Sequence, residues 1–283
     1  MFCFSSKFVL SIFAAFCFIL LAGAEEKWPG KKGDWSGFIR YKFQFEGKNA
    51  WVKVPEKAAP GNPWVWRGRW ADFHSGTDRI LLKKGYHIAY LDTGGMLGCD
   101  TALELWDKFY AEMTGKYKMA RKPALEAVSR GGLFVLRWAA RHPDRVACIY
   151  LDSPVCDIKS WPLGKWKGDH DSTGMKQLGI YYGLKTEEEI MAYDKNPVDD
   201  VIVKPIADAK IPILAIVNKD DRIVPPDENI EIFAEKYKKF GGSEIDIIHP
   251  DPDAKTALKG HHFPVPNPKK SADFIQKYTS SGN

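Results

Sequence analysis

The apolar positions along the chain predict an open sheet whose strands alternate with helices. After a hairpin around Gly47, short apolar runs alternate with longer segments in which apolar residues recur every three to four positions. Strands that alternate with helices in this way predict an α/β fold, with a mostly parallel central sheet and helices on both faces. The strands are expected at 38–45, 50–54, 63–66, 86–91, 123–128, 146–151, 213–217 and 245–248, and the main helices at 76–84, 102–117, 131–141, 228–240 and 271–278.

Residues 153–210 depart from this alternation. Aromatic residues are interleaved there with glycine, proline and lysine, and two short helices are expected at 186–193 and 200–209. We interpret the segment as a small, aromatic-rich, cap-like insertion after the sixth strand, within a single domain of residues 36–283. Its tryptophans are Trp161 and Trp166, and two adjacent tyrosines, Tyr181 and Tyr182, follow them.

The first 24 residues have the pattern of a cleavable secretory signal peptide. Lys7 precedes an apolar run, and Ala22 and Ala24 supply small side chains at positions −3 and −1 of a cleavage site. The run is too short to predict a membrane span, so no stable membrane anchor is expected after cleavage. Residues 25–35, rich in charged residues and glycine, are expected to form a solvated leader. The pattern predicts a secreted or periplasmic protein.

Composition limits the possible partners and cofactors. The chain has 283 residues, 45% of them hydrophobic, which is enough for one large core. Its net charge of +5 comes from scattered residues, so no nucleic-acid partner is expected. No H-E-x-x-H motif or Cys/His cluster at ligand spacing occurs in the sequence, so neither a metal nor another cofactor is expected.

Three cysteines remain beyond the signal: Cys99, Cys148 and Cys156. An oxidising compartment permits one disulfide among them, which leaves at least one thiol unpaired. Cys148 lies inside an apolar run and is expected to be a buried free thiol.

One serine stands where a predicted strand turns into a helix. Ala127 and Gly131 lie two positions before and after Ser129. Small residues are needed there because the strand and helix backbones pass close together. The spacing is that of a nucleophile elbow, usually G-x-S-x-G, with alanine in the first position.

A serine hydroxyl becomes a useful nucleophile when an imidazole takes its proton and a carboxylate orients the imidazole. The predicted carboxylate is Asp221, which follows the strand at 213–217 and stands four residues before Pro225. Asp220 and Asp152, also at strand ends, are the alternatives; a loop-capping role is the other interpretation of each.

The base is expected between the last strand and the final helix. His261 follows Gly260 directly, as is usual for a catalytic histidine, and His262 is the alternative base. The resulting order of serine, acid and histidine is the one used by hydrolases that carry this elbow.

The oxyanion of a tetrahedral intermediate needs hydrogen-bond donors. We expect the backbone N–H of Arg130, at the start of the elbow helix where the helix dipole helps, and the backbone N–H of Arg67, after the strand at 63–66. The Arg67 side chain is alternatively placed to bind an acidic group of the substrate. The residues expected to bind substrate are Trp66, Trp161, Trp166 and His170, with core packing as the alternative role of the aromatic ones.

On these residues the chain resembles the α/β-hydrolase superfamily over nearly all of its length beyond the signal. Residues 63–67, 129–132 and 260–262 are similar to secreted bacterial hydrolases found among carbohydrate-ester esterases. The pair Ser129 and Arg130 resembles the Ser-Arg pair of glucuronoyl esterases, which implies that the Arg130 side chain assists the oxyanion. The chain departs from these patterns at Ala127, in place of glycine, and at 263–264, where Phe-Pro replaces Pro-His.

The resemblance implies a serine hydrolase that cleaves a small-molecule or polysaccharide ester through an acyl-enzyme. Aromatic rings suit sugar faces, so a carbohydrate-borne acetyl or methyl uronate ester is the expected substrate class. Two alternatives stay open: a serine peptidase similar to the prolyl oligopeptidase group, and a non-catalytic secreted binding protein on the hydrolase fold.

Overall fold

Nine strands form one mixed sheet, in the order β1-β2-β3-β5-β4-β6-β7-β8-β9. The computed structural model describes residues 28–251, 253–265 and 267–279, so the predicted signal peptide of residues 1–24 lies outside the described residues. β1, β2, β3 and β5 pair antiparallel, and β5, β4, β6, β7, β8 and β9 pair parallel. The strands are β1 Lys31–Trp35, β2 Phe38–Phe45, β3 Lys48–Val54, β4 Trp64–Arg67, β5 His87–Leu91, β6 Ala124–Val128, β7 Cys148–Asp152, β8 Ile213–Ile216 and β9 Ile245–Ile248.

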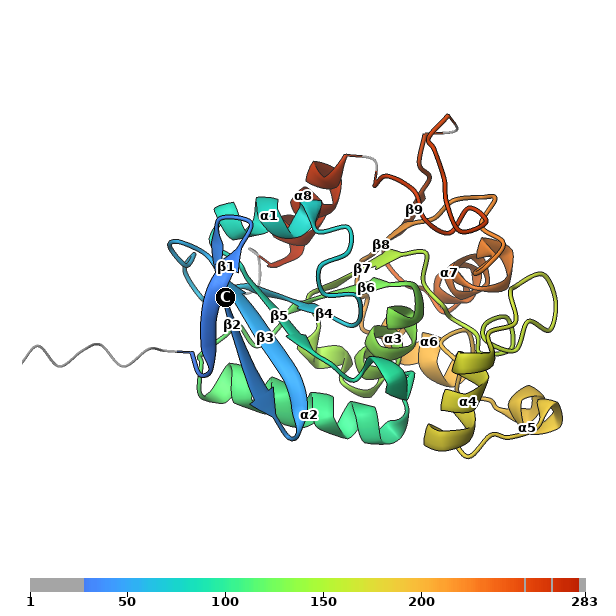
Figure 1. The fold of residues 1–283 in the computed structure, drawn as a ribbon. Coiled ribbons are helices and arrows are strands. Elements are labelled where there is room, and N and C mark those ends of the chain that lie inside the picture. Colours follow the sequence, from blue (N-terminus) through green and yellow to red (C-terminus); the bar gives the residue numbers. More distant parts are fainter. Residues whose placement is uncertain (1–27, 252, 266, 280–283) are drawn as a thin grey trace, which may run out of the picture.

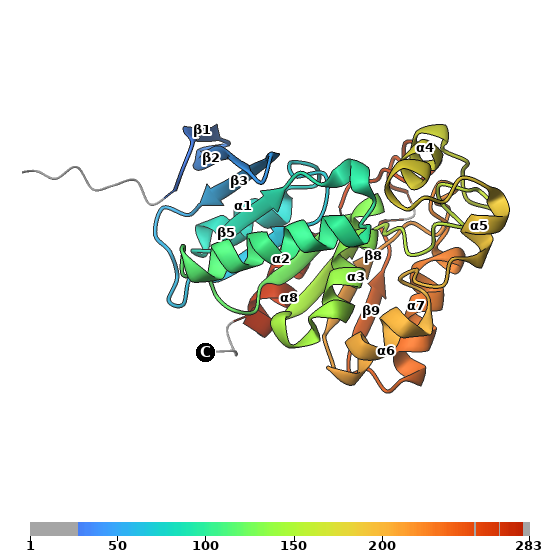
Figure 2. The same ribbon diagram turned by 90° about the horizontal axis from the view of Figure 1, so that it is seen from below.

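Helices cover both faces of the sheet, as the sequence predicted (Figures 1 and 2). On one face, α1 and α8 enclose a core that includes Val65 of β4; on the other, α2, α3, α6 and α7 enclose a core that includes Trp66. β4 to β7 are buried on both faces, which explains why apolar residues dominate them. The helices are α1 Gly76–Lys83, α2 Asp100–Gly115, α3 Gly132–Arg141, α4 Ser172–Tyr181, α5 Glu187–Ala192, α6 Asp200–Asp208, α7 Ile230–Lys239 and α8 Pro268–Thr279. Among the described residues, no helix is long and apolar enough to cross a membrane.

The prediction that residues 25–35 form a solvated leader is wrong for its second half, because Lys31–Trp35 forms the edge strand β1. Only Trp35 of this strand is buried, so its sequence lacks the apolar run that marks a buried strand. Trp28, just before it, is also buried and stacks on Tyr117 at a ring distance of 4.3 Å. The sheet therefore begins earlier in the chain than the hydrophobic pattern indicates.

The insertion between β7 and β8 divides into two parts. Its outer part carries α4 and α5, which stand away from the sheet in Figures 1 and 2. α6 instead packs beside α3 and α7 on the face of the sheet, with Ile202, Val203 and Ile206 in the core. The helix α4 was not predicted; its N-terminus is capped by the Asp171 carboxylate, which accepts from the Gly174 N–H at 2.6 Å.

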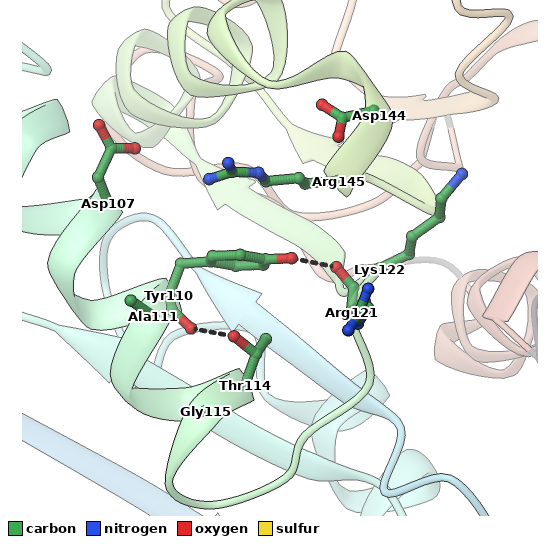
Figure 3. Close-up of a pocket in the computed structure, with 9 residues that line it drawn as sticks. All are labelled: Asp107, Tyr110, Ala111, Thr114, Gly115, Arg121, Lys122, Asp144 and Arg145. Carbon is green, nitrogen blue, oxygen red and sulfur yellow. Dashed lines mark hydrogen bonds between the residues drawn. The ribbon is translucent and has the colours of Figure 1, made fainter.

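The two ends of the parallel strands differ in what they carry. β5 and β6 lie on opposite sides of β4, so the chain reverses direction across the sheet there, and parallel sheets bind ligands at the carboxyl ends beside such a point. At the opposite, amino ends, a groove of about 720 Å³ lies between α2 and the starts of β6 and β7. Figure 3 shows its Tyr110 ring, whose hydroxyl donates to the Arg121 carbonyl, with Arg145 alongside.

Cys99, Cys148 and Cys156 are separate buried thiols. The expectation for Cys148 is confirmed: it lies in the core between the sheet and α1 and α8, and burial raises the pKa of its thiol.

Candidate active site

The turn after β6 places Ser129 at a sharp corner. Its φ is +52°, in the left-handed region that a residue other than glycine seldom adopts. A β-carbon on Gly131 would lie 3.2 Å from the Ala127 β-carbon and 3.2 Å from that of Arg69, and one on Gly132 would lie 2.6 Å from the Val155 carbonyl oxygen. The small residues of the motif are therefore needed because neighbouring chain segments pass close by.

Ser129, His261 and Asp221 form one chain of hydrogen bonds. The Ser129 hydroxyl lies 3.0 Å from His261 Nε2, and His261 Nδ1 lies 2.6 Å from Asp221 Oδ2. The other carboxylate oxygen of Asp221 accepts from the backbone N–H groups of Ile223 and Val224, both at 2.9 Å. Because Asp221 accepts at Nδ1, that nitrogen carries the proton and leaves Nε2 free to accept the serine proton.

The loop before His261 explains why glycine precedes it. Gly260 has a φ of +90°, and a β-carbon there would lie 2.5 Å from the Asp220 carbonyl oxygen. The Asn218 side chain donates to the Gly260 carbonyl at 2.9 Å and fixes the loop to the end of β8. Asn218 stands three residues before Asp221 and was not among the residues predicted for the site.

His262, the alternative base, points elsewhere. It lines the pocket in front of Ser129 and packs on the Phe73 ring at 4.8 Å, but the structure places His261 between the serine and the acid. Burial lowers the pKa of His262 and the nearby His261 and His74 lower it further, while Asp152 and Asp221 oppose the shift. The alternative acids also lie outside the chain of hydrogen bonds: Asp220 is exposed, and Asp152 pairs with His74.

A pocket of about 300 Å³ opens onto the serine hydroxyl. Its walls come from the elbow, the loop after β4, the insertion and the loops that carry the acid and the histidine. The lining residues are Trp70, Phe73, Val128, Ser129, Arg130, Trp161, Asp171, Ile223, Leu258, His261 and His262.

The predicted contribution of Arg67 to the oxyanion site is wrong. β4 runs one residue further than expected, so Arg67 pairs with β5 and β6 in the middle of the sheet. The next N–H, of Gly68, donates to the Glu126 carbonyl at 2.7 Å. The first residues after these sheet hydrogen bonds are Arg69 and Trp70. Arg69 packs against Gly131, and Trp70 lines the pocket. The backbone N–H groups of residues 69–70 are therefore nearer the pocket than that of Arg67, while Arg130 lies in the first turn after the serine and lines the pocket, where its N–H stays the other predicted oxyanion donor.

The Arg67 side chain lies beneath this loop in a buried cluster of charges. Its guanidinium contacts the carboxylates of Asp78 and Glu126, both at 2.9 Å, and donates to the carbonyls of Trp70 and Phe73 at 3.2 and 2.6 Å. Lys53 completes the cluster 3.0 Å from Asp78 and 2.9 Å from the Ala71 carbonyl. Burial alone would lower the pKa of Arg67, but Asp78 and Glu126 raise it above its ordinary value. The cluster holds the loop from below, and none of its side chains lines the pocket.

Burial raises the pKa of Glu126 to about 8, with Arg67 opposing the shift and Asp78 adding to it. Between the ordinary carboxyl pKa and about 8, the folded chain therefore keeps a proton that the unfolded chain has released, so stability falls as pH rises through this range. We expect Glu126→Gln to remove about 1 kcal/mol or more of this fall between pH 5 and pH 8. Urea unfolding at the two pH values measures it. The exposed Glu235→Gln change on α7 is the matched control and should leave the fall unchanged; an equally steep fall in Glu126→Gln would contradict the assignment.

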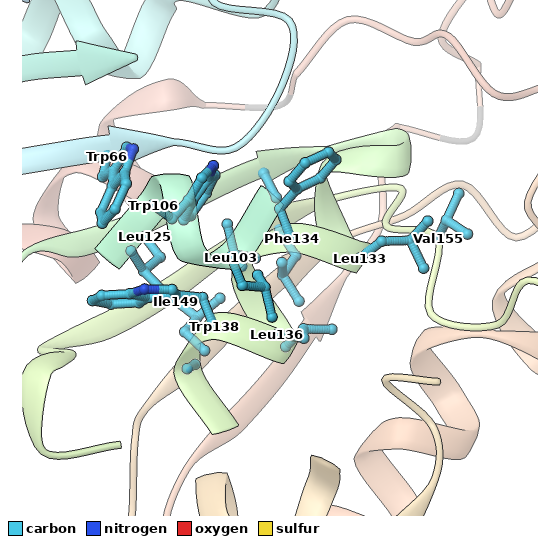
Figure 4. Packing of buried hydrophobic residues seen from close by; sticks show 14 of the residues in the cluster. Trp66, Leu103, Trp106, Leu125, Leu133, Phe134, Leu136, Trp138, Ile149 and Val155 are labelled. Carbon is cyan, nitrogen blue, oxygen red and sulfur yellow. The ribbon is translucent and has the colours of Figure 1, made fainter. Parts of the chain in front are cut away.

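Trp66, predicted to bind substrate, is a core residue. Its ring stacks on Trp106 at 4.3 Å and meets Trp138 edge-on at 5.0 Å, and Figure 4 shows the three rings among the buried hydrophobic residues. Trp66 is not among the residues that line the pocket. Its side chain faces α2 and α3 because alternate residues of β4 face opposite sides of the sheet.

Of the expected insertion residues, only Trp161 reaches the pocket. Trp166 is exposed on the outer surface, and His170 is exposed with its Nδ1 3.1 Å from the Leu163 carbonyl. Tyr181 is exposed at the end of α4. The Tyr182 ring packs against the core, and its hydroxyl donates to the Leu97 carbonyl at 2.8 Å. The predictions for Trp66, Trp166 and His170 as residues of the pocket are therefore wrong.

A second histidine–aspartate pair beside the pocket was not predicted from the sequence. His74 Nδ1 bonds the Asp152 carboxylate and links the loop after β4 to the end of β7. Trp70 and His74 in this loop, and Ser153 after β7, have φ values of +54°, +51° and +41°. The sequence offered one sign of this arrangement, an aspartate at the end of a buried strand.

In the described part of the chain, no three His, Cys, Asp or Glu side chains are placed to hold a metal ion.

No family model and no curated protein matches this sequence, whereas many solved structures match its fold. One is the crystal structure of 2,6-dihydroxy-pseudo-oxynicotine hydrolase, at 16% identity and a TM-score of 0.61 over 86% of this chain and 68% of that one. An acylaminoacyl peptidase of Pyrococcus horikoshii has 15% identity and a TM-score of 0.60 over 86% of this chain and 42% of that one. An esterase of Pyrococcus furiosus has 17% identity and a TM-score of 0.55 over 90% and 98%. The chain thus spans less than half the length of the peptidase chain. Identities this low concern the fold alone, and together with the strand order and the elbow they lead to one conclusion: this chain has the α/β-hydrolase fold.

Proposed function

We propose that the chain is a secreted serine hydrolase that cleaves carboxylic esters through an acyl-enzyme. The observation that carries this proposal is the Ser129–His261–Asp221 chain of hydrogen bonds, at 3.0 and 2.6 Å, at the base of an open pocket. A serine placed in this way has its base and the orienting acid within reach before any substrate binds. The signal-peptide pattern of residues 1–24 supports a site of action outside the cytoplasm.

The proposed reaction has two halves. Ser129 Oγ attacks the ester carbonyl carbon while His261 Nε2 takes the hydroxyl proton, and the backbone N–H of Arg130 and one from 69–70 bind the oxyanion. The C–O bond to the alcohol then breaks as His261 returns the proton to the leaving oxygen. A water molecule then attacks the acyl-enzyme as His261 takes its proton, and the acid leaves as His261 returns that proton to Ser129 Oγ. Asp221 stabilises the imidazolium in both halves.

For the substrate class we propose an ester carried by a carbohydrate, either an acetyl ester or a methyl uronate. The aromatic rings of Trp70, Phe73 and Trp161 line the pocket and offer apolar faces to a sugar ring. The pocket is open at the surface and is bordered by loops, which suits a group that projects from a polysaccharide as well as a small molecule.

A serine peptidase is the second candidate, and the likeness to an acylaminoacyl peptidase favours it. The same triad and oxyanion site would attack a peptide carbonyl, with His261 protonating the leaving amine. The proposal of a non-catalytic binding protein has no comparable support, because the serine, histidine and carboxylate are all present and in contact.

A substrate panel tests the proposed function. The protein without its signal is assayed on 4-nitrophenyl acetate and butyrate, on acetylated and methyl-esterified polysaccharides, and on aminoacyl 4-nitroanilides. We expect hydrolysis of the 4-nitrophenyl esters and release of acetate or methanol from at least one polysaccharide. Cleavage of the anilides with little activity on all esters would favour the peptidase, and no cleavage of any substrate would favour the binding protein.

A further inference from the structure

The Arg130 guanidinium faces the pocket next to the nucleophile without a carboxylate partner. Its one hydrogen bond among the described residues goes to the neutral Gln177 side chain, at 3.3 Å. The guanidinium lies 4.7 Å from the centre of the Trp161 ring and 5.7 Å from that of Trp70, so two aromatic rings hold it in place. Arg67 and Arg137, the more deeply buried arginines, each have carboxylate partners.

The charges around Arg130 leave this cation uncompensated. Burial lowers the pKa of Arg130, the nearby Arg69 lowers it further, and Asp171 opposes the shift. Asp171 lines the pocket, but its carboxylate accepts from the N-terminus of α4 and forms no ion pair with Arg130. Arg69 has its own partners in Asp92 and Tyr90, both at 3.4 Å. A partly buried cation that no neighbouring anion neutralises is stabilised when an anion binds in the pocket.

We propose that the pocket takes esters that carry a free carboxylate, and that the Arg130 side chain binds this carboxylate beside Ser129. The inference rests on the proposed function and narrows it: within the carbohydrate esters it selects acidic sugars, such as an acetylated uronate, over neutral ones. Arg130 is then a specificity residue, in addition to the place of its backbone N–H in the oxyanion site. A planar guanidinium suits this task because it binds both oxygens of a carboxylate at once.

A matched pair of sugar esters tests the proposal. Acetate release is measured from acetylated methyl galacturonoside, which carries a carboxylate, and from acetylated methyl galactoside, which carries a CH₂OH group instead; 4-nitrophenyl acetate reports the chemical step alone. We expect the unmodified protein to prefer the uronate by about 10-fold or more in kcat/KM, mainly through KM. Arg130→Gln should remove that preference, because its loss of kcat/KM on the uronate should exceed its losses on the galactoside and on 4-nitrophenyl acetate by about 10-fold, and Arg130→Lys should keep part of it.

The control removes the same charge far from the pocket. Arg145→Gln, in the groove at the amino ends of the strands, should leave the preference intact. Equal rates on the two sugars, or an equal loss on all three substrates in Arg130→Gln, would overturn the proposal, the latter because Arg130 would then act on the oxyanion alone. If no ester is cleaved, the proposed function fails, and calorimetry decides the inference separately. Ser129→Ala should bind methyl galacturonoside, and binding should be lost with Arg130→Gln added; binding that is absent or unchanged would overturn it.

Discussion

Replacing Ser129 with alanine is expected to lower kcat/KM for 4-nitrophenyl butyrate by about 10⁴- to 10⁶-fold. The change removes the oxygen that forms the acyl-enzyme and leaves the pocket and the oxyanion donors in place. Some rate above that of water should remain, because the oxyanion site and substrate binding still act. Initial rates at saturating and at low substrate separate kcat from KM, and kcat should account for most of the loss.

A folding control is needed because Ser129 has a left-handed backbone conformation. Alanine adopts that conformation as reluctantly as serine, so the midpoint of thermal unfolding should change little. Equal activity of the two proteins, with equal stability, would rule out Ser129 as the nucleophile.

The second large effect separates the two neighbouring histidines. His261→Ala should lower kcat by about 10⁴-fold or more, because it removes the group that takes the serine proton. His262→Ala should cost no more than about 10-fold, because that ring only lines the pocket. Both variants are assayed on 4-nitrophenyl butyrate across pH.

His262→Ala is also the matched control, since it removes the same side chain one residue away. Asp221→Asn should follow His261→Ala in direction, because the asparagine amide donates to Nδ1 and holds the imidazole in the wrong tautomer. Full activity in His261→Ala together with loss of activity in His262→Ala would reverse the assignment.

The elbow and its partners were predictable because each leaves a direct trace in the sequence. Close contact between strand and helix requires small residues at Ala127 and Gly131, and a left-handed turn requires a glycine at 260. The buried parallel strands appear as short, mainly apolar runs, so their positions along the chain and their approximate limits could also be predicted.

The second oxyanion donor was misplaced because a strand buried on both faces gives no sign of where it ends. Trp64–Arg67 is buried at every position, and Arg67 is buried by virtue of Asp78 and Glu126, which lie distant in sequence. A charged residue at the end of an apolar run was interpreted as the start of the loop. The strand and its sheet bonds continue through Arg67 and Gly68, so the donor that we propose lies at 69–70 and not at 67.

The roles of the aromatic residues in the insertion could not be predicted, for a different reason. Trp161, Trp166 and Tyr182 are all aromatic residues of the same polar segment. Trp161 nevertheless lines the pocket, Trp166 is exposed, and the Tyr182 hydroxyl donates to the Leu97 carbonyl. The segment folds through contacts between parts far apart in the chain, such as that of α4 with Gly94–Met96. Periodicity carries no information about such contacts.

Reaction of the folded protein with diisopropyl fluorophosphate, followed by mass spectrometry of its peptides, tests the central claim most directly. The account predicts one covalent label, on Ser129, that forms in the native protein and is lost in His261→Ala but kept in His262→Ala. A label on another serine, or an unlabelled Ser129 in a folded protein that still hydrolyses esters, would contradict it.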